Sequence, residues 1–114
     1  MSLMLRRGER VPIKGRVVTV TDTAFEHLPD VRDYLREVAR RRQTVTYGRL
    51  KADLDLPYLV QGMGRLLDLL SEDCRRRGEP SLAALVVNQA TGEVGDDVGG
   101  EAAAERELVY ASLR

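Results

Sequence analysis

The sequence predicts a single small α+β domain over residues 1–114, because helical and strand patterns alternate along one short chain. Apolar residues recur at three- and four-residue spacing from residue 31 to residue 74, which is typical of amphipathic helices. Runs rich in β-branched residues occur at 16–21 and 81–88, which is typical of strands. A chain of 114 residues can bury one hydrophobic core but not two independent ones.

Composition limits the class of protein. The 43% of hydrophobic and 32% of charged residues are typical of a globular domain. No apolar run approaches the roughly 20 residues of a membrane helix, and the first residues lack the pattern of a signal peptide, so we expect a cytoplasmic protein without a membrane partner. Cys74 is the only cysteine, which excludes an internal disulfide and a cysteine-cluster zinc site.

The charges are unevenly distributed, although 18 basic residues balance 18 acidic ones. Residues 1–65 carry 13 Lys and Arg against 8 Asp and Glu, a net charge of 13 − 8 = +5. Residues 66–114 carry 5 against 10, a net charge of 5 − 10 = −5. This asymmetry either forms a basic face on a neutral protein or lets the two halves attract each other, and the sequence leaves both interpretations open.

The N-terminal part is expected to hold one strand. Residues 1–10 are polar and basic, and we expect them to form a flexible arm that is ordered only in part. The β-branched residues from Arg16 to Thr21 predict a strand, since Pro12 and Gly15 delay its start.

A helix is expected over residues 29–42. Its apolar residues form one stripe, and Pro29 suits a first helical position. Three arginines complement the negative end of the helix dipole, and this explains them in part without any ligand: Arg40, Arg41 and Arg42.

Two further helices are expected after a short break. Thr46 should cap a helix over residues 47–54, because its hydroxyl can accept a backbone N–H two or three residues later. Pro57 should open a longer helix that runs to about Arg77. Gly48, in the first turn of the shorter helix, has two explanations: close packing against a neighbour, or a backbone N–H left bare for a phosphate. The apolar stripe of the longer helix is expected to contain Leu59, Met63, Leu66, Leu67, Leu70 and Cys74.

The C-terminal part is expected to contain a β-hairpin and a helix. The run "SLAALVVN" predicts a strand, "QATG" a turn and "EVGDDVG" a returning strand. Residues 101–114 have high helix propensity and should place Leu108, Val109 and Leu113 on one side. The order of helix, short helix, longer helix and hairpin is that of a winged helix-turn-helix, here with an N-terminal strand and a C-terminal helix.

The segments "VTYGRL" and "QGMGRLL", followed by an apolar strand and a glycine-containing hairpin, resemble the winged-helix domain of the DNA alkyltransferases and alkyltransferase-like proteins. The resemblance covers about residues 29–100 and is strongest at Tyr47 and Gly48. It implies a domain that binds duplex DNA through the minor groove and rotates a base out of the stack. The run "SLAALVVNQATGEVGDD" is also similar to a segment of small bacterial and phage proteins of unknown function.

The chain departs from this family where the family does its chemistry. The repair motif Pro-Cys-His-Arg is absent, since the corresponding place reads "EPSLAALVV", and alkyl transfer to a thiolate is therefore excluded. The arginine that the family inserts into DNA corresponds here to Leu59 or Gln61, which puts base flipping by an arginine in doubt. The single histidine, His27, has no nucleophile or carboxylate at a telling spacing, so we expect no catalytic residue, no metal and no cofactor.

Two functions fit this sequence. The first is a non-catalytic DNA-binding protein whose partner is double-stranded DNA. The second is a protein-interaction or self-assembly module on the same scaffold, with a second copy or another protein as its partner. For the first function, we expect phosphate contacts from Arg40, Arg41, Arg42, Thr46, Gly48, Arg49 and Lys51, groove contacts from Tyr58, Gln61 and Arg65, and wing contacts from Asn88 and Gln89.

Overall fold

An antiparallel hairpin precedes the helices in the computed structural model, which describes residues 3–59, 62–88 and 101–113. Its strands are β1 (Arg10–Ile13) and β2 (Arg16–Thr19). Lys14 and Gly15 form the turn with positive φ angles of 53° and 79°, the combination that two-residue hairpin loops favour. The strand predicted over residues 16–21 corresponds to β2 but is two residues too long at its C-terminal end. Strand β1 was not predicted, because Pro12 was interpreted as delaying the start of the strand.

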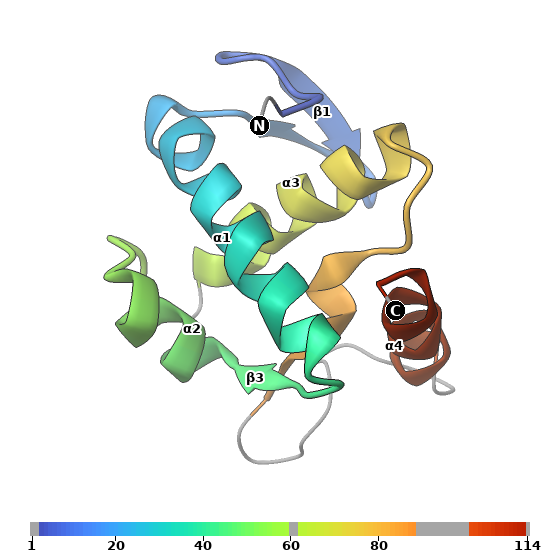
Figure 1. The fold of residues 1–114 in the computed structure, drawn as a ribbon. Helices are drawn as coiled ribbons and strands as arrows, with labels where there is room; N and C mark the ends of the chain where they lie inside the picture. Colours follow the sequence, from blue (N-terminus) through green and yellow to red (C-terminus); the bar gives the residue numbers. More distant parts are fainter. Residues whose placement is uncertain (1–2, 60–61, 89–100, 114) are drawn as a thin grey trace.

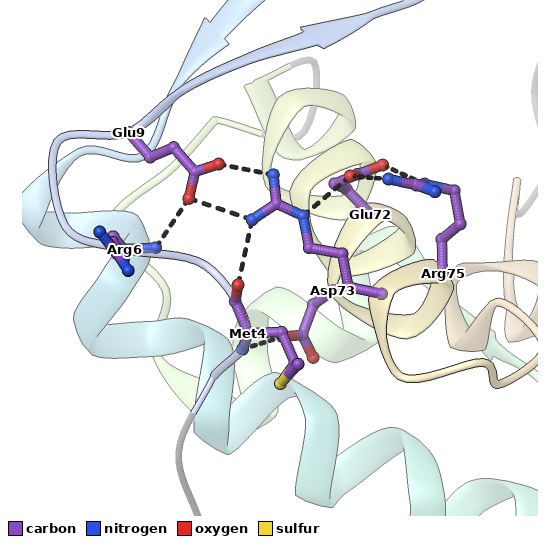
Figure 2. Close-up of polar contacts among 7 residues, drawn as sticks. Met4, Arg6, Glu9, Glu72, Asp73 and Arg75 are labelled. Carbon is purple, nitrogen blue, oxygen red and sulfur yellow. Dashed lines mark hydrogen bonds and ion pairs between the residues drawn. The ribbon is translucent and has the colours of Figure 1, made fainter.

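The segment expected to form a flexible arm contacts α3 (Met63–Arg76) in the structure (Figure 2). The backbone N–H of Met4 donates to the fully buried carboxylate of Asp73 at 2.6 Å. Arg76 donates to the carbonyl of Met4 at 3.0 Å and forms an ion pair with Glu9. Leu5 is only 2% exposed, so an apolar side chain accompanies these polar contacts.

Helix α1 (Asp22–Arg40) begins before Pro29, and the prediction of a start at Pro29 is therefore wrong. Thr21 caps the helix, because its hydroxyl accepts the N–H of Ala24 at 3.1 Å. The extra turns bury Ala24 and Leu28 against the core. This burial outweighs the backbone hydrogen bond that a proline inside a helix cannot make.

Strand β3 (Val45–Thr46) leads into α2 (Tyr47–Leu54), which confirms the helix predicted over residues 47–54. Helix α3, in contrast, begins at Met63, and the prediction that Pro57 opens it is wrong. Asp55 ends α2 in the left-handed conformation (φ 51°), and the chain then runs through a connection that buries Leu56. Leu59 lies in this connection with 70% of its surface exposed, so it does not belong to the apolar stripe of α3.

A 3₁₀ helix, η2 (Leu82–Leu85), and strand β4 (Val86–Val87) replace the single strand expected at 81–88. Strand β4 pairs in parallel with β3, with Val45 opposite Val86 and Thr46 opposite Val87. The expected turn and returning strand fall in residues 89–100, outside the described residues.

Helix α4 (Glu101–Ser112) confirms the predicted C-terminal helix. Val109 and Tyr110 are buried, whereas Leu108 is 56% exposed, so the expected placement of Leu108 with Val109 on the packed side is wrong. Tyr110 also donates a hydrogen bond to the carbonyl of Gln43 at 2.8 Å, which ties α4 to the segment after α1.

Helix α1 lies at the centre of the described part and contacts α2, α3, η2 and α4 (Figure 1). The side chain of Arg32 on α1 is buried among these elements, with only 2% of its surface exposed. Its guanidinium donates to both carboxylate oxygens of Glu79, at 2.8 and 2.9 Å. Within the described ranges, no helix is both long and apolar enough to cross a membrane. The core is formed mainly by Leu28, Val31 and Leu35 of α1, Leu50 of α2, Met63, Leu66, Leu70 and Cys74 of α3, and Leu85, Val86 and Val109.

Candidate nucleic-acid interface

The candidate site begins with the way in which the chain enters α2. Thr46 has an extended conformation, and its hydroxyl accepts the N–H of Arg49 at 3.1 Å. The N–H of Gly48 lies one residue earlier in the same first turn and has no hydrogen-bond partner among the described residues. Backbone N–H groups of this kind, at the positive end of a helix dipole, are suited to anions.

Gly48 does not pack closely against a neighbour. A Cβ atom placed on this residue would meet nothing within 4 Å, and its φ is not in the left-handed region. Of the two explanations that the sequence allows, close packing of the helix start is therefore wrong. The open space beside Gly48 is part of a hollow in the surface.

This hollow, of about 860 Å³, lies between the C-terminal half of α1 and the start of α2. Four of the residues that the sequence predicts at phosphates line it: Arg41, Thr46, Gly48 and Arg49. We call it the α1–α2 hollow. Its remaining lining residues are Tyr34, Glu37, Val38, Gln43, Thr44, Val45 and Asp53.

The arginines at the end of α1 outnumber the carboxylates that pair with them. Glu37 accepts a hydrogen bond from Arg40 at 3.3 Å and forms an ion pair with Arg41 at 3.4 Å, so one carboxylate faces two guanidinium groups. Arg42 pairs with Glu107 of α4 at 3.6 Å, and its guanidinium lies 5.0 Å from the centre of the Tyr110 ring. The lining of the α1–α2 hollow itself is balanced, with Arg41 and Arg49 against Glu37 and Asp53, and the other two arginines are the chain neighbours of Arg41.

Arg49 is held by a second helix as well as by its own. Its Nε donates to both carboxylate oxygens of Asp53, at 2.9 and 3.0 Å, and the hydroxyl of Tyr34 on α1 donates to Asp53 at 2.5 Å. The hydrogen bonds from Tyr34 and Arg49 lower the pKa of Asp53, so this carboxylate remains ionised. Burial, together with the Asp53 carboxylate, raises the pKa of Tyr34 to about 12, which keeps the hydroxyl protonated as a donor.

The predicted groove contacts do not form a common exposed surface among the described residues. Arg65 is exposed on the first turn of α3, but Tyr58 lies before that helix and is half-buried. The Tyr58 hydroxyl is buried near Thr21 without a hydrogen bond of good geometry, and burial raises its pKa. Lys51 is half-buried on α2 outside the hollow and Asn88 is exposed after β4, whereas Gln61 and Gln89 lie outside the described residues.

Among the lining residues that were missed in the sequence, three make the side-chain contacts around the arginines: Tyr34, Glu37 and Asp53. The spacing of Glu37 to Arg41 and of Arg49 to Asp53 is four residues, the separation at which side chains meet on one helix face. This signal was available in the sequence. Tyr34 gave no such signal, because its ring fits the apolar stripe of α1 and only the packing of α1 on α2 brings its hydroxyl to Asp53.

The chain matches no protein-family model, no curated protein and no solved structure. The resemblance to the alkyltransferase family therefore depends on the sequence motifs alone. Among the described residues, no group of three or more His, Cys, Asp and Glu side chains is arranged to hold a metal ion. A guanidinium group that keeps unused donors within the described part of the chain, such as that of Arg49, can bind an anion non-covalently.

Proposed function

We propose that this chain is a non-catalytic DNA-binding protein that holds the phosphate backbone of a duplex at the α1–α2 hollow. The observation that carries the proposal is the convergence there of two arginines, Arg41 and Arg49, with the bare N–H of Gly48. Guanidinium groups and helix N-termini are the usual protein partners of phosphate oxygens. Phosphate contacts of this kind set affinity and position and carry no sequence preference.

The element order supports a winged helix-turn-helix scaffold for this function. Helices α1, α2 and α3 follow one another with the short β3 between α1 and α2, and β4 after α3 returns to pair with β3. In such a scaffold, Arg65, on the first turn of α3, would be the residue best placed to reach base edges.

The intramolecular ion pairs of the arginines at the end of α1 do not prevent phosphate binding. The pairs of Arg40 and Arg41 with Glu37 are solvent-exposed, and exposed pairs of this kind contribute only about 0–1 kcal/mol each. A phosphate that replaces Glu37 as the partner of an arginine, or shares the arginine with it, therefore costs the protein little stability. The neutral net charge of the chain still predicts weak binding that depends strongly on salt.

Fluorescence polarisation of a labelled duplex at low and moderate salt tests the proposal. We expect the affinity of the wild-type protein to fall steeply with salt, because binding releases counterions from the phosphates. Arg49→Ala should weaken binding about 3- to 10-fold at low salt and reduce the salt slope by about 1. Arg75→Ala is the matched control, since Arg75 is equally exposed (71% against 72%) and also pairs with a carboxylate on its own helix, but does not line the hollow.

Two outcomes would contradict this proposal. If the wild-type protein binds no duplex at low salt, the DNA-binding function is wrong. If Arg49→Ala and Arg75→Ala weaken binding equally, the protein binds DNA through diffuse charge and the α1–α2 hollow is not the site.

A second candidate function has one specific observation in its favour. Leu108 is 56% exposed on α4, beside Glu107, which pairs with Arg42. Together with the net charges of +5 over residues 1–65 and −5 over residues 66–114, this exposed leucine is compatible with a contact between two copies of the chain. Size-exclusion chromatography with light scattering tests the self-assembly version: a dimer that Leu108→Gln converts to monomer would support it, and a wild-type monomer at high concentration would exclude it.

A further inference from the structure

The contacts of Arg49 differ from those of Arg75, another exposed arginine that pairs with a carboxylate on its own helix. Arg75 uses Nε and Nη2 together, at 2.8 and 2.6 Å, so its guanidinium fork closes on Glu72 (Figure 2). Arg49 uses only Nε, which donates to both oxygens of Asp53. Its terminal Nη1 and Nη2 groups have no hydrogen-bond partner among the described residues. The stronger fork-shaped contact is thus left for a ligand.

We infer that Tyr34 and Asp53 are positioning residues, which fix the guanidinium of Arg49 so that its two terminal nitrogens receive a phosphate at the α1–α2 hollow. This inference rests on the proposed function and names how that site recognises its anion. Asp53 holds the Nε side of Arg49, and Tyr34, from a different helix, holds Asp53. A pre-positioned arginine loses less side-chain freedom on binding than a mobile one, which is the physical gain.

The contact among Tyr34, Asp53 and Arg49 differs from an ion pair that only stabilises a helix. An exposed pair of residues four apart on a helix contributes only a small amount of stability and does not require a third partner. Here the third partner comes from α1, and Tyr34 and Asp53 are lining residues of the same hollow as Arg49. The carboxylate of Asp53 is itself a repulsive charge for a phosphate, and the ion pair with Arg49 offsets this charge.

Tyr34→Phe separates positioning from charge, because it removes one hydroxyl and leaves every charge in place. We expect duplex binding to weaken about 3-fold at low salt with the salt slope unchanged. Ser71→Ala is the control, since it removes a hydroxyl hydrogen bond, of 2.7 Å between Ser71 and Ser81, and neither serine lines the hollow. Asp53→Asn should also weaken binding, although it removes a negative charge and would strengthen binding if Asp53 were only repulsive.

NMR of the Arg49 Nε–H group provides a readout that does not depend on DNA. With inorganic phosphate as the probe, the wild-type resonance should shift on titration, and Tyr34→Phe should broaden that resonance and weaken the response. If no shift occurs in the wild-type protein, or if Tyr34→Phe responds as the wild type does, the positioning role is wrong.

The outcomes distinguish this inference from the proposed function. If Arg49→Ala weakens duplex binding but Tyr34→Phe does not, the site stands and the positioning role is overturned. If the wild-type protein binds no duplex, the proposed function is overturned, and the phosphate titration alone decides whether Tyr34 and Asp53 position Arg49 for an anion.

Discussion

Replacing Gly48 with alanine should raise stability and weaken binding. Alanine is about 1 kcal/mol more favourable than glycine inside a helix, and we expect about half of this in the first turn, ~0.5 kcal/mol. No steric cost offsets the gain, because a Cβ atom at residue 48 meets nothing within 4 Å and the backbone φ is not left-handed. The midpoint of thermal unfolding should therefore rise by about 2 °C.

The effect on binding should have the opposite sign. The methyl group that Gly48→Ala adds would occupy the α1–α2 hollow beside the bare N–H, and we expect duplex affinity to fall about 2- to 5-fold. Urea unfolding followed by circular dichroism measures the first quantity, and fluorescence polarisation measures the second.

Gly64→Ala is the matched control for the stability measurement. Gly64 occupies the same position in the first turn of α3, and a Cβ atom there also meets nothing within 4 Å. We expect the same gain in stability. If Gly48→Ala lowers the free energy of unfolding, the conclusion that a Cβ atom at residue 48 meets no neighbour is wrong. If Gly48→Ala leaves the duplex affinity unchanged, the N–H of residue 48 does not contact a phosphate.

Three further predictions concern stability. Arg32→Leu should destabilise the protein by about 3 kcal/mol in urea unfolding, because Asp73 and Glu79 lose the buried cation beside them; a loss below about 1 kcal/mol would contradict this. Thr46→Ala should cost about 1 kcal/mol through the lost cap of α2, whereas Thr46→Ser should cost little. The hydrogen bond from Arg75, with that from Arg76, lowers the pKa of Glu72 from its ordinary 4.5 to about 2. Its ionised form therefore stabilises the fold above about pH 4.5, and this contribution is lost as the pH falls towards 2, so Glu72→Gln should show a shallower loss of stability over that window than the wild type.

Helix α2 could be predicted from the sequence because its signals are local. Thr46 caps the start of the helix, and the helix ends at Leu54, just before Asp55. The start and the end each depend only on residues that are close in the chain. The starts of α1 and α3 were predicted at prolines and are wrong in both cases. Proline favours a helix start without requiring one: α1 begins earlier, at the Thr21 cap, and α3 begins later, after a connection that buries Leu56.

The candidate site was predictable in part. The sequence indicates Arg41, Thr46, Gly48 and Arg49 as phosphate contacts, and the structure brings these four together around the α1–α2 hollow. It gives no sign that Tyr34 reaches Asp53, because these residues are on different helices. The distance between their oxygen atoms depends on how α1 packs on α2, which no periodicity encodes.

Local sequence is enough to specify the α+β composition of this protein, the cap of α2, and which residues carry positive charge near it. These properties depend on neighbours along the chain and on hydrophobic spacing, so no long-range contact is needed to predict them. Long-range packing, by contrast, pairs β3 with β4, buries Arg32 beside Glu79 and leaves Gly48 facing open space. Each of these depends on contacts between segments far apart in the chain, whose free energy is set by packing and not by local preference.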